Sequence, residues 1–183
     1  MLAHADKLLS IEEFYVQYAD QKAELVDGRV RLMSGAARRH NEIAGNVLAE
    51  LHGRFKGDPC RVYGSDMGVK TGSASVRYPD VVVTCDPRDI EGDGFSRQHL
   101  EHPKVLFEVL SPSTERGDRS DKLMDHKALP SVETGVLVNP RTERIDTYER
   151  VGELEWRNLT LLSGAALTLL DPALTLTAEM IFA

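Results

Sequence analysis

The chain has 183 residues, of which 42% are hydrophobic and 28% are charged, and its formal net charge at pH 7 is −7. These values are typical of one soluble globular domain with a substantial core. The negative charge argues against a protein that coats nucleic acid non-specifically, because such binding depends on Lys and Arg neutralising phosphates. The negative charge is compatible with an enzyme that contacts phosphates only at one site, beside a metal ion.

The sequence lacks features of membrane insertion and of export. It has no run of about 18 apolar residues that could span a membrane, and its first ten residues, MLAHADKLLS, lack the basic start and apolar centre of a secretion signal. Cys60 and Cys85 lie in strand-like surroundings, and neither has another Cys or His at the spacing of a zinc site. We therefore expect a cytoplasmic protein with two buried, reduced thiols rather than a disulfide.

The N-terminal region predicts a short helix and a hairpin. Ser10 is followed three residues later by Glu13, a capping-box pattern that precedes an apolar stripe and favours a helix. Two β-prone runs then follow, 24–26 and 29–33, and Asp27-Gly28 joins them as the turn of a hairpin.

The clearest helix is predicted from Arg38 to Phe55, where apolar residues recur at spacings of three and four. His40 falls on the apolar face, one turn before Ile43, so its side chain should point inward at the N-terminal end of the helix. A histidine in such a place is more often a satisfied core residue than a functional one. We keep His40 as a secondary site residue.

The remaining elements alternate between strands and one further helix. A polar segment at 86–103 is expected to be a long, mobile loop, and a charged segment from Glu115 leads into a helix that ends near Leu129, before Pro130. We predict a mixed α/β (α+β) fold in a single domain spanning 1–183. The predicted strands are 60–64, 66–72, 75–87, 105–110, 132–140, a hairpin of 144–150 with 154–162 through Val151-Gly152, and a last strand in 173–182.

Two carboxylates interrupt apolar strands. Glu108 lies at the centre of the run 105–110 and shares one face of that strand with Leu106 and Leu110. Burying a lone carboxylate is expensive. Asp80 opens the strand PDVVVT, and if the two strands are neighbours in one sheet, Asp80 and Glu108 converge at its edge, where a cation would join them. The simpler alternatives are a turn role for Asp80 and a structural ion pair for Glu108.

A hard divalent cation, Mg²⁺ or Mn²⁺, suits two carboxylates, and hydrolysis of phosphodiesters is chemistry that uses it. A lysine commonly assists, but Leu110 stands at the position two residues after Glu108 where that lysine would share its face. The next helix offers a substitute, because Arg119, Lys122 and His126 are spaced to line one of its faces. Lys122 is the candidate that reaches the site. The alternative is that Lys122 lies on a solvated face of the helix and has no catalytic role.

Several stretches together resemble one family. They are AELVDGRVRLMSG followed by His40, then YPDVVV, FEVLSPST, DRSDK and GVLVNP, in this order. The pattern resembles the PD-(D/E)XK nuclease superfamily, and within it the Uma-type restriction endonucleases, over roughly Glu24 to Pro140.

This resemblance implies a restriction-endonuclease-like core, a mixed sheet flanked by helices. It implies Asp80 and Glu108 as metal ligands, Lys122 as the migrated catalytic lysine and Glu24 as an auxiliary acidic residue. Two positions differ from the family pattern: His126 replaces the usual Tyr one turn after the lysine, and Asn139 replaces the usual Asp of the turn after a later strand.

The sequence therefore predicts a Mg²⁺- or Mn²⁺-dependent endonuclease that acts on DNA and has no membrane partner. A homodimer or a higher homo-oligomer is expected, because cleavage of two strands usually calls for two active sites. Two alternatives stay open. One is a non-catalytic binding module on the same fold, and the other is an enzyme that acts on structured RNA.

Overall fold

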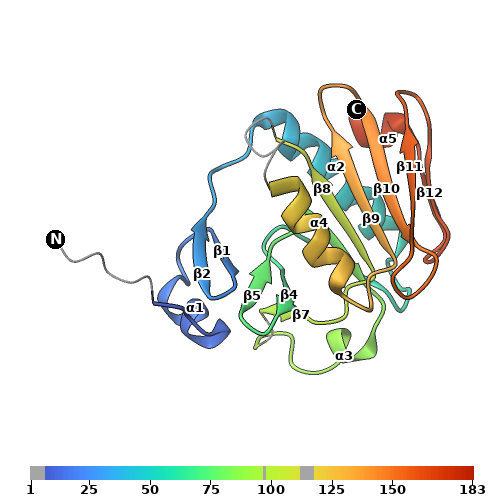
Figure 1. The fold of residues 1–183 in the computed structure, drawn as a ribbon. Helices are drawn as coiled ribbons and strands as arrows, with labels where there is room; N and C mark the ends of the chain where they lie inside the picture. Colours follow the sequence, from blue (N-terminus) through green and yellow to red (C-terminus); the bar gives the residue numbers. More distant parts are fainter. Residues whose placement is uncertain (1–6, 97, 112–117) are drawn as a thin grey trace.

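The computed structural model describes residues 7–96, 98–111 and 118–183, of which 118–121 are described by their backbone alone. Two β-sheets form the framework, and helices lie against them (Figure 1). The mixed α/β fold that the sequence predicts is confirmed. The helices are α1 (Ile11–Gln17), α2 (Arg38–Arg54), α3 (Pro87–Ile90), α4 (Asp118–Ala128) and α5 (Ala178–Phe182).

The first sheet has five strands and begins with the predicted hairpin. At its turn, Asp27 and Gly28 have φ angles of 48° and 76°, the left-handed conformation that a two-residue hairpin turn needs. Both contacts of the predicted capping box are present at Ser10, where α1 begins. The strand order is β2 (Arg29–Leu32), β1 (Ala23–Val26), β5 (Ser75–Arg77), β4 (Gly68–Gly72) and β7 (His99–Leu100).

The second sheet has six strands, and β6 and β8 are antiparallel neighbours within it, as the sequence predicts. The parallel pair is β8 with β9, which α4 connects. The order is β11 (Trp156–Leu161), β10 (Arg144–Arg150), β9 (Thr134–Asn139), β8 (Val105–Val109), β6 (Val81–Thr84) and β3 (Arg61–Gly64).

The two faces of the six-stranded sheet pack against different layers. Phe107 of β8 belongs to a core cluster with Ile43 of α2. Its neighbour Leu106 packs with Val82 of β6 and with Val69 of the five-stranded sheet. Because side chains alternate along a strand, the even-numbered positions of β8 face the five-stranded sheet. The helix α4 contacts both sheets, at β4 and at β9, and Figure 1 shows it lying between them.

The predicted strand at 75–87 is wrong as a single element. It forms two strands, β5 and β6, that belong to different sheets. The chain leaves β5 at Tyr78-Pro79, where proline lacks an N–H for a ladder and restricts the residue before it. This break places Asp80 between the two sheets.

The predicted mobile loop at 86–103 is also wrong, because it contains α3 and β7. Asp86 caps α3 by accepting a hydrogen bond from the backbone N–H of Arg88. The buried carboxylate of Asp89 accepts hydrogen bonds from the backbone N–H groups of Glu101 and His102, at 3.0 and 2.8 Å. A buried carboxylate with several donors therefore ties the two ends of this segment together.

The C-terminal prediction is partly right. Of the single strand expected within 173–182, only β13 (Leu174–Leu176) forms, and α5 follows it, capped by Thr177. A strand that the sequence did not predict, β12 (Leu167–Leu169), pairs with β13 in a small two-stranded sheet.

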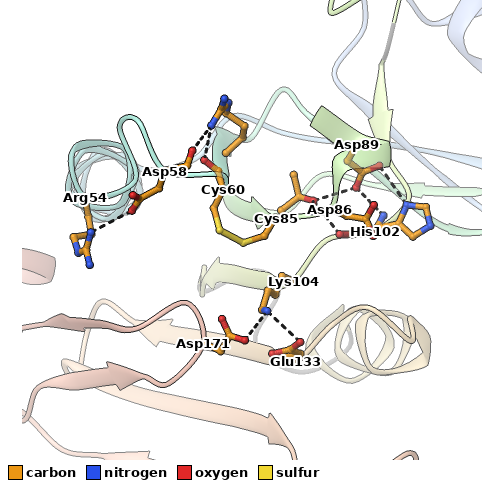
Figure 2. The surroundings of a disulfide bond; sticks show 12 residues. Arg54, Asp58, Cys60, Cys85, Asp86, Asp89, His102, Lys104, Glu133 and Asp171 are labelled. Atoms are coloured by element: carbon orange, nitrogen blue, oxygen red, sulfur yellow. Dashed lines mark hydrogen bonds and ion pairs between the residues drawn. A yellow bond between two sulfur atoms is a disulfide. The ribbon is translucent and has the colours of Figure 1, made fainter. Parts of the chain in front are cut away.

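The expectation of two separate reduced thiols is wrong, since the structure joins Cys60 and Cys85 in a disulfide (Figure 2). The two residues lie directly opposite each other because Arg61 pairs with Thr84 on the neighbouring strands β3 and β6. The disulfide therefore links these strands at the end opposite to Asp80.

Among the residues that the structure describes, none of the helices is both long and apolar enough to cross a membrane.

Candidate active site

Asp80 and Glu108 come together as the sequence predicts. Val81 of β6 pairs with Phe107 of β8, so the next position in the same register holds Asp80 opposite Glu108. Oδ2 of Asp80 accepts a hydrogen bond of 2.7 Å from the backbone N–H of Val109. The side chain of Asp80 is 14% exposed and that of Glu108 is 13% exposed. Two nearly buried carboxylates thus meet where β6 begins.

His40 reaches this pair from the first turn of α2. Its Nε2 lies 3.2 Å from Oδ2 of Asp80, and its Nδ1 is buried without a hydrogen-bond partner in the described part of the chain. The inward orientation that the sequence predicts for His40 is therefore confirmed. The imidazole and the N–H of Val109 together fix the carboxylate of Asp80.

Lys122 points into the site from α4. Its Nζ lies 3.1 Å from Oε1 of Glu24 and 3.7 Å from Oε1 of Glu108, and its side chain is 20% exposed. Leu110 is buried, and its hydrocarbon side chain supplies no polar group. The predicted migration of the lysine to the next helix matches this geometry.

Glu24 belongs to a buried network whose other members, Arg77 and Asp125, are not predicted from the sequence. Oε2 of Glu24 lies 3.1 Å from the guanidinium of Arg77, a residue with 1% exposure. The same guanidinium donates two hydrogen bonds, of 2.9 and 2.7 Å, to Oδ2 of Asp125 on α4. The backbone N–H of Tyr78 donates to Oε1 of Glu24. Arg77 therefore connects β1 and α4, and a lone Arg in the apolar context of SVRYP was the only signal that could have indicated it.

His126 lies one helical turn after Lys122 and is nearly buried, with a side chain that is 5% exposed. Its Nε2 is 3.9 Å from Oε1 of Glu108. Both atoms are buried, and neither has a hydrogen-bond partner within the described residues. The remaining predicted site residue is Arg119, on α4. The structure describes only its backbone, so the predicted position of its side chain at the site lies outside the described part of the structure.

The burial of this cluster changes the protonation of its members. Burial raises the pKa of Glu108 to about 8; the charge of Lys122 opposes this rise and that of Asp80 adds to it. Burial by itself would lower the pKa of Lys122, but Glu108 and Glu24 outweigh it and raise that pKa above its ordinary value. At neutral pH, Lys122 is therefore charged, and the burial of Glu108 favours its protonated form as long as no further cation joins it.

Burial also lowers the pKa of His126, to about 3, and the positive charges of Lys122 and Arg77 lower it further. The imidazole of His126 is therefore neutral at every pH at which the protein is expected to work.

A hard divalent ion fits the donors of this site. Mg²⁺ binds proteins through one or two carboxylates and completes its octahedron with water and substrate oxygens. Asp80 and Glu108 supply these carboxylates, and Oε1 of Glu108 is a buried oxygen without a hydrogen-bond partner in the described structure. No group of three or more His, Cys, Asp or Glu in the described residues is arranged to hold a metal. The candidate is accordingly a two-carboxylate site open to other oxygen ligands.

One sizeable cavity lies elsewhere. It measures about 780 Å³, lies between α2 and the β12–β13 hairpin, and is lined mainly by Ala, Leu and Thr, with Glu50 and Arg54 as its charged residues. It lacks a pair of facing carboxylates, so we assign the chemistry to the Asp80–Glu108 cluster.

Comparisons with known proteins agree with this fold. The chain is 30% identical to "Uncharacterized protein slr1290" of Synechocystis over 190 residues, which cover 100% of this chain and 97% of that protein. It is 26% identical to "Uncharacterized protein sll1609" of the same organism, over 90% of this chain and 93% of that protein.

Among solved structures, the fold matches "a putative nuclease belonging to DUF820" from Anabaena variabilis. The TM-score is 0.75 at 16% identity, over 95% of this chain and 97% of the other. The model of the family Uma2, described as "Putative restriction endonuclease", matches residues 9–180. The chain therefore belongs to the Uma2 family.

Proposed function

We propose that this protein is a Mg²⁺- or Mn²⁺-dependent endonuclease that hydrolyses phosphodiester bonds in DNA. The observation that carries the proposal is the meeting of Asp80, Glu108 and Lys122 from three separate elements at one nearly buried place. Membership of the Uma2 family, with its restriction-endonuclease description, supports a nucleic-acid substrate.

Asp80 and Glu108 would hold the divalent ion. Bound there, the ion would stabilise the negative charge that builds on the phosphoryl oxygens and lower the pKa of the attacking water. His40 and the N–H of Val109 keep Asp80 in one orientation, so this ligand needs little rearrangement. A ligand that is already fixed loses less conformational entropy on binding.

Lys122 would act as a cation rather than as a base. Because the neighbouring carboxylates raise its pKa, it keeps its proton at neutral pH. A protonated lysine can orient a water molecule and stabilise a phosphate oxygen, but it cannot accept a proton. Glu24 holds Lys122 in place at 3.1 Å, and Arg77 in turn holds Glu24.

One observation favours a second candidate, a binding module without catalysis. Lys122 and Arg77 already supply positive charge to Glu24 and Glu108 without a metal ion. In that case the cluster would be a structural ion-pair network, and it would stabilise the contact of α4 with the sheets.

The experiment that separates the two candidates is a cleavage assay on a mixed DNA pool, with a structured RNA pool in parallel, in Mg²⁺, Mn²⁺ or EDTA. The variants are Asp80→Asn and Glu108→Gln, which keep the shape of each side chain. The control is Asp171→Asn, because Asp171 pairs with Lys104 at the surface. We expect metal-dependent DNA cleavage in the wild type and the control, and a loss in both site variants. Folded wild-type protein that cleaves neither pool would overturn the nuclease proposal in favour of the binding module.

We also propose a homodimer, which would supply two active sites for the two strands of a duplex. Light scattering coupled to size-exclusion chromatography tests this. A molar mass of one chain at the concentration of the cleavage assay contradicts it.

A further inference from the structure

His126 has no part in the reaction proposed above, yet it contains one of the few buried polar atoms that lack a partner in the described part of the structure. Its Nε2 and Oε1 of Glu108 are both buried, neither has a hydrogen-bond partner among the described residues, and they lie 3.9 Å apart. Leaving a buried donor or acceptor without a hydrogen bond is destabilising, so such atoms are uncommon in native proteins. Two of them facing each other indicate that the arrangement is completed in another state of the site.

The two atoms are about 1 Å beyond the length of a hydrogen bond. A small rotation of the Glu108 side chain would close this gap. Oε1 of Glu108 also lies near Lys122, but that ammonium group is 3.7 Å away and is closer to Glu24, at 3.1 Å. His126 is therefore the group best placed to fix this oxygen while Lys122 is held by Glu24.

The chemistry of the imidazole suits this task. An imidazole can donate a hydrogen bond from its Nε2–H, and in the neutral form it adds no positive charge that would repel a metal ion. Hydrogen bonds from such partners commonly orient the carboxylates that bind metals in proteins.

We propose that His126 is a positioning residue whose Nε2–H donates a hydrogen bond to Oε1 of Glu108 and holds that carboxylate in the orientation that binds the divalent ion. The proposal rests on the proposed function, since it assumes that Glu108 is a metal ligand. In this role His126 contacts Glu108, the metal ligand, and does not contact the substrate.

The test measures Mn²⁺ affinity directly, by calorimetry and by electron paramagnetic resonance of free Mn²⁺, without DNA. The variants are His126→Phe, which keeps a ring but removes the donor, and His126→Gln, which restores an N–H donor. The control is His52→Phe, which replaces an exposed histidine on α2. Circular dichroism verifies that each variant is folded.

We expect His126→Phe to weaken Mn²⁺ binding by about 10–100-fold, the usual effect of losing such a partner. His126→Gln should recover most of this loss, and His52→Phe should bind as the wild type does. Equal affinity of the wild type and folded His126→Phe would overturn the role of His126 and leave the proposed function standing. Absence of Mn²⁺ binding by the wild type would instead overturn the metal site itself, and the role of His126 with it.

A second measurement does not depend on the folding of a variant. In wild-type protein labelled with ¹⁵N-histidine, NMR identifies which ring nitrogen of His126 carries the proton. We expect a protonated Nε2 whose signal shifts when Mg²⁺ is added. An Nε2 without a proton in the Mg²⁺-loaded protein would overturn the proposal.

Discussion

The ammonium group of Lys122, on α4, lies 3.7 Å from the carboxylate of Glu108, on β8, although fourteen positions of sequence separate them. In the superfamily pattern that this chain resembles, the lysine would stand two residues after the glutamate, on the same strand. Leu110 occupies that position and lies in the core. The lysine therefore reaches the same carboxylate from a helix that packs on the face of the sheet where Glu108 lies.

Replacing Lys122 with Met tests the role of this cation. The variant keeps the length of the side chain and removes its charge, so we expect cleavage to fall by about 10²–10³-fold, the range for losing one group that stabilises the charge of the transition state. The matched control is Lys127→Met on the same helix, because Lys127 lies over the rings of Tyr148 and Trp156 and away from the site. Initial cleavage rates at saturating Mg²⁺ provide the measurement, and equal rates for the two variants would contradict the role of Lys122.

Replacing Arg77 with Met should destabilise the whole protein. Arg77 is almost fully buried and pairs with Glu24 and Asp125. Its removal leaves the buried carboxylate of Glu24 without its guanidinium, which typically costs about 3–5 kcal/mol. The control Arg38→Met affects a pair that is largely exposed, with 90% exposure of Arg38, and should change stability by less than about 1 kcal/mol. Urea unfolding measures both, and similar free energies of unfolding for the two variants would refute this description of the network.

The raised pKa of Glu108 predicts how stability depends on pH in the absence of metal. Between pH 4.5, the ordinary pKa, and about 8, the folded protein keeps a proton on Glu108 that the unfolded chain has lost. The folded state binds more protons in this window, so the contribution of Glu108 to stability falls as pH rises through it. The slope is at most about 1.4 kcal/mol per pH unit.

Glu108→Gln is neutral at every pH and should lack this fall. Urea unfolding of both proteins in EDTA, at several pH values across the window, gives the difference in their free energies of unfolding. We expect this difference to move steadily in favour of the Gln variant up to about pH 8 and then to level off. Parallel curves would mean that Glu108 is ionised in the folded protein well below pH 8.

The disulfide between Cys60 and Cys85 predicts a further stability change. It closes a loop with a sequence separation of 25, for which the chain-entropy relation gives a stabilisation of about 3.5 kcal/mol. The double variant Cys60→Ala with Cys85→Ala should lower the free energy of unfolding by roughly that amount relative to the oxidised protein. A thiol assay on unfolded wild-type protein, with and without reductant, checks the bond itself, and two reactive thiols without reductant would contradict it.

Local patterns in the sequence predict a large part of the site. The two apolar runs with a carboxylate each are strong strand signals, and their pairing places Asp80 opposite Glu108. The inward face of α2 follows from its apolar periodicity, so the place of His40 follows as well. The prediction that Lys122 lies at the site depended on the family resemblance, because the spacing of residues on a helix does not show which face of the helix packs against the sheet.

Other features depend on contacts between distant elements and have no local signal. The partners of Arg77 become visible only when β5 is placed beside β1 and under α4, since Asp125 is 48 positions away. The disulfide depends on the register of β3 with β6, which composition does not reveal. The split of 75–87 into two strands depends on Pro79 separating two sheets, and a single run of β-prone residues hides this.

The most direct test of the central claim is a crystal soaked with Mn²⁺ and examined by anomalous diffraction. We predict an anomalous peak between the carboxylates of Asp80 and Glu108, with Lys122 directed toward the same space. A peak elsewhere, or no peak at an Mn²⁺ concentration that supports DNA cleavage, would contradict the assignment of these two residues as the metal ligands.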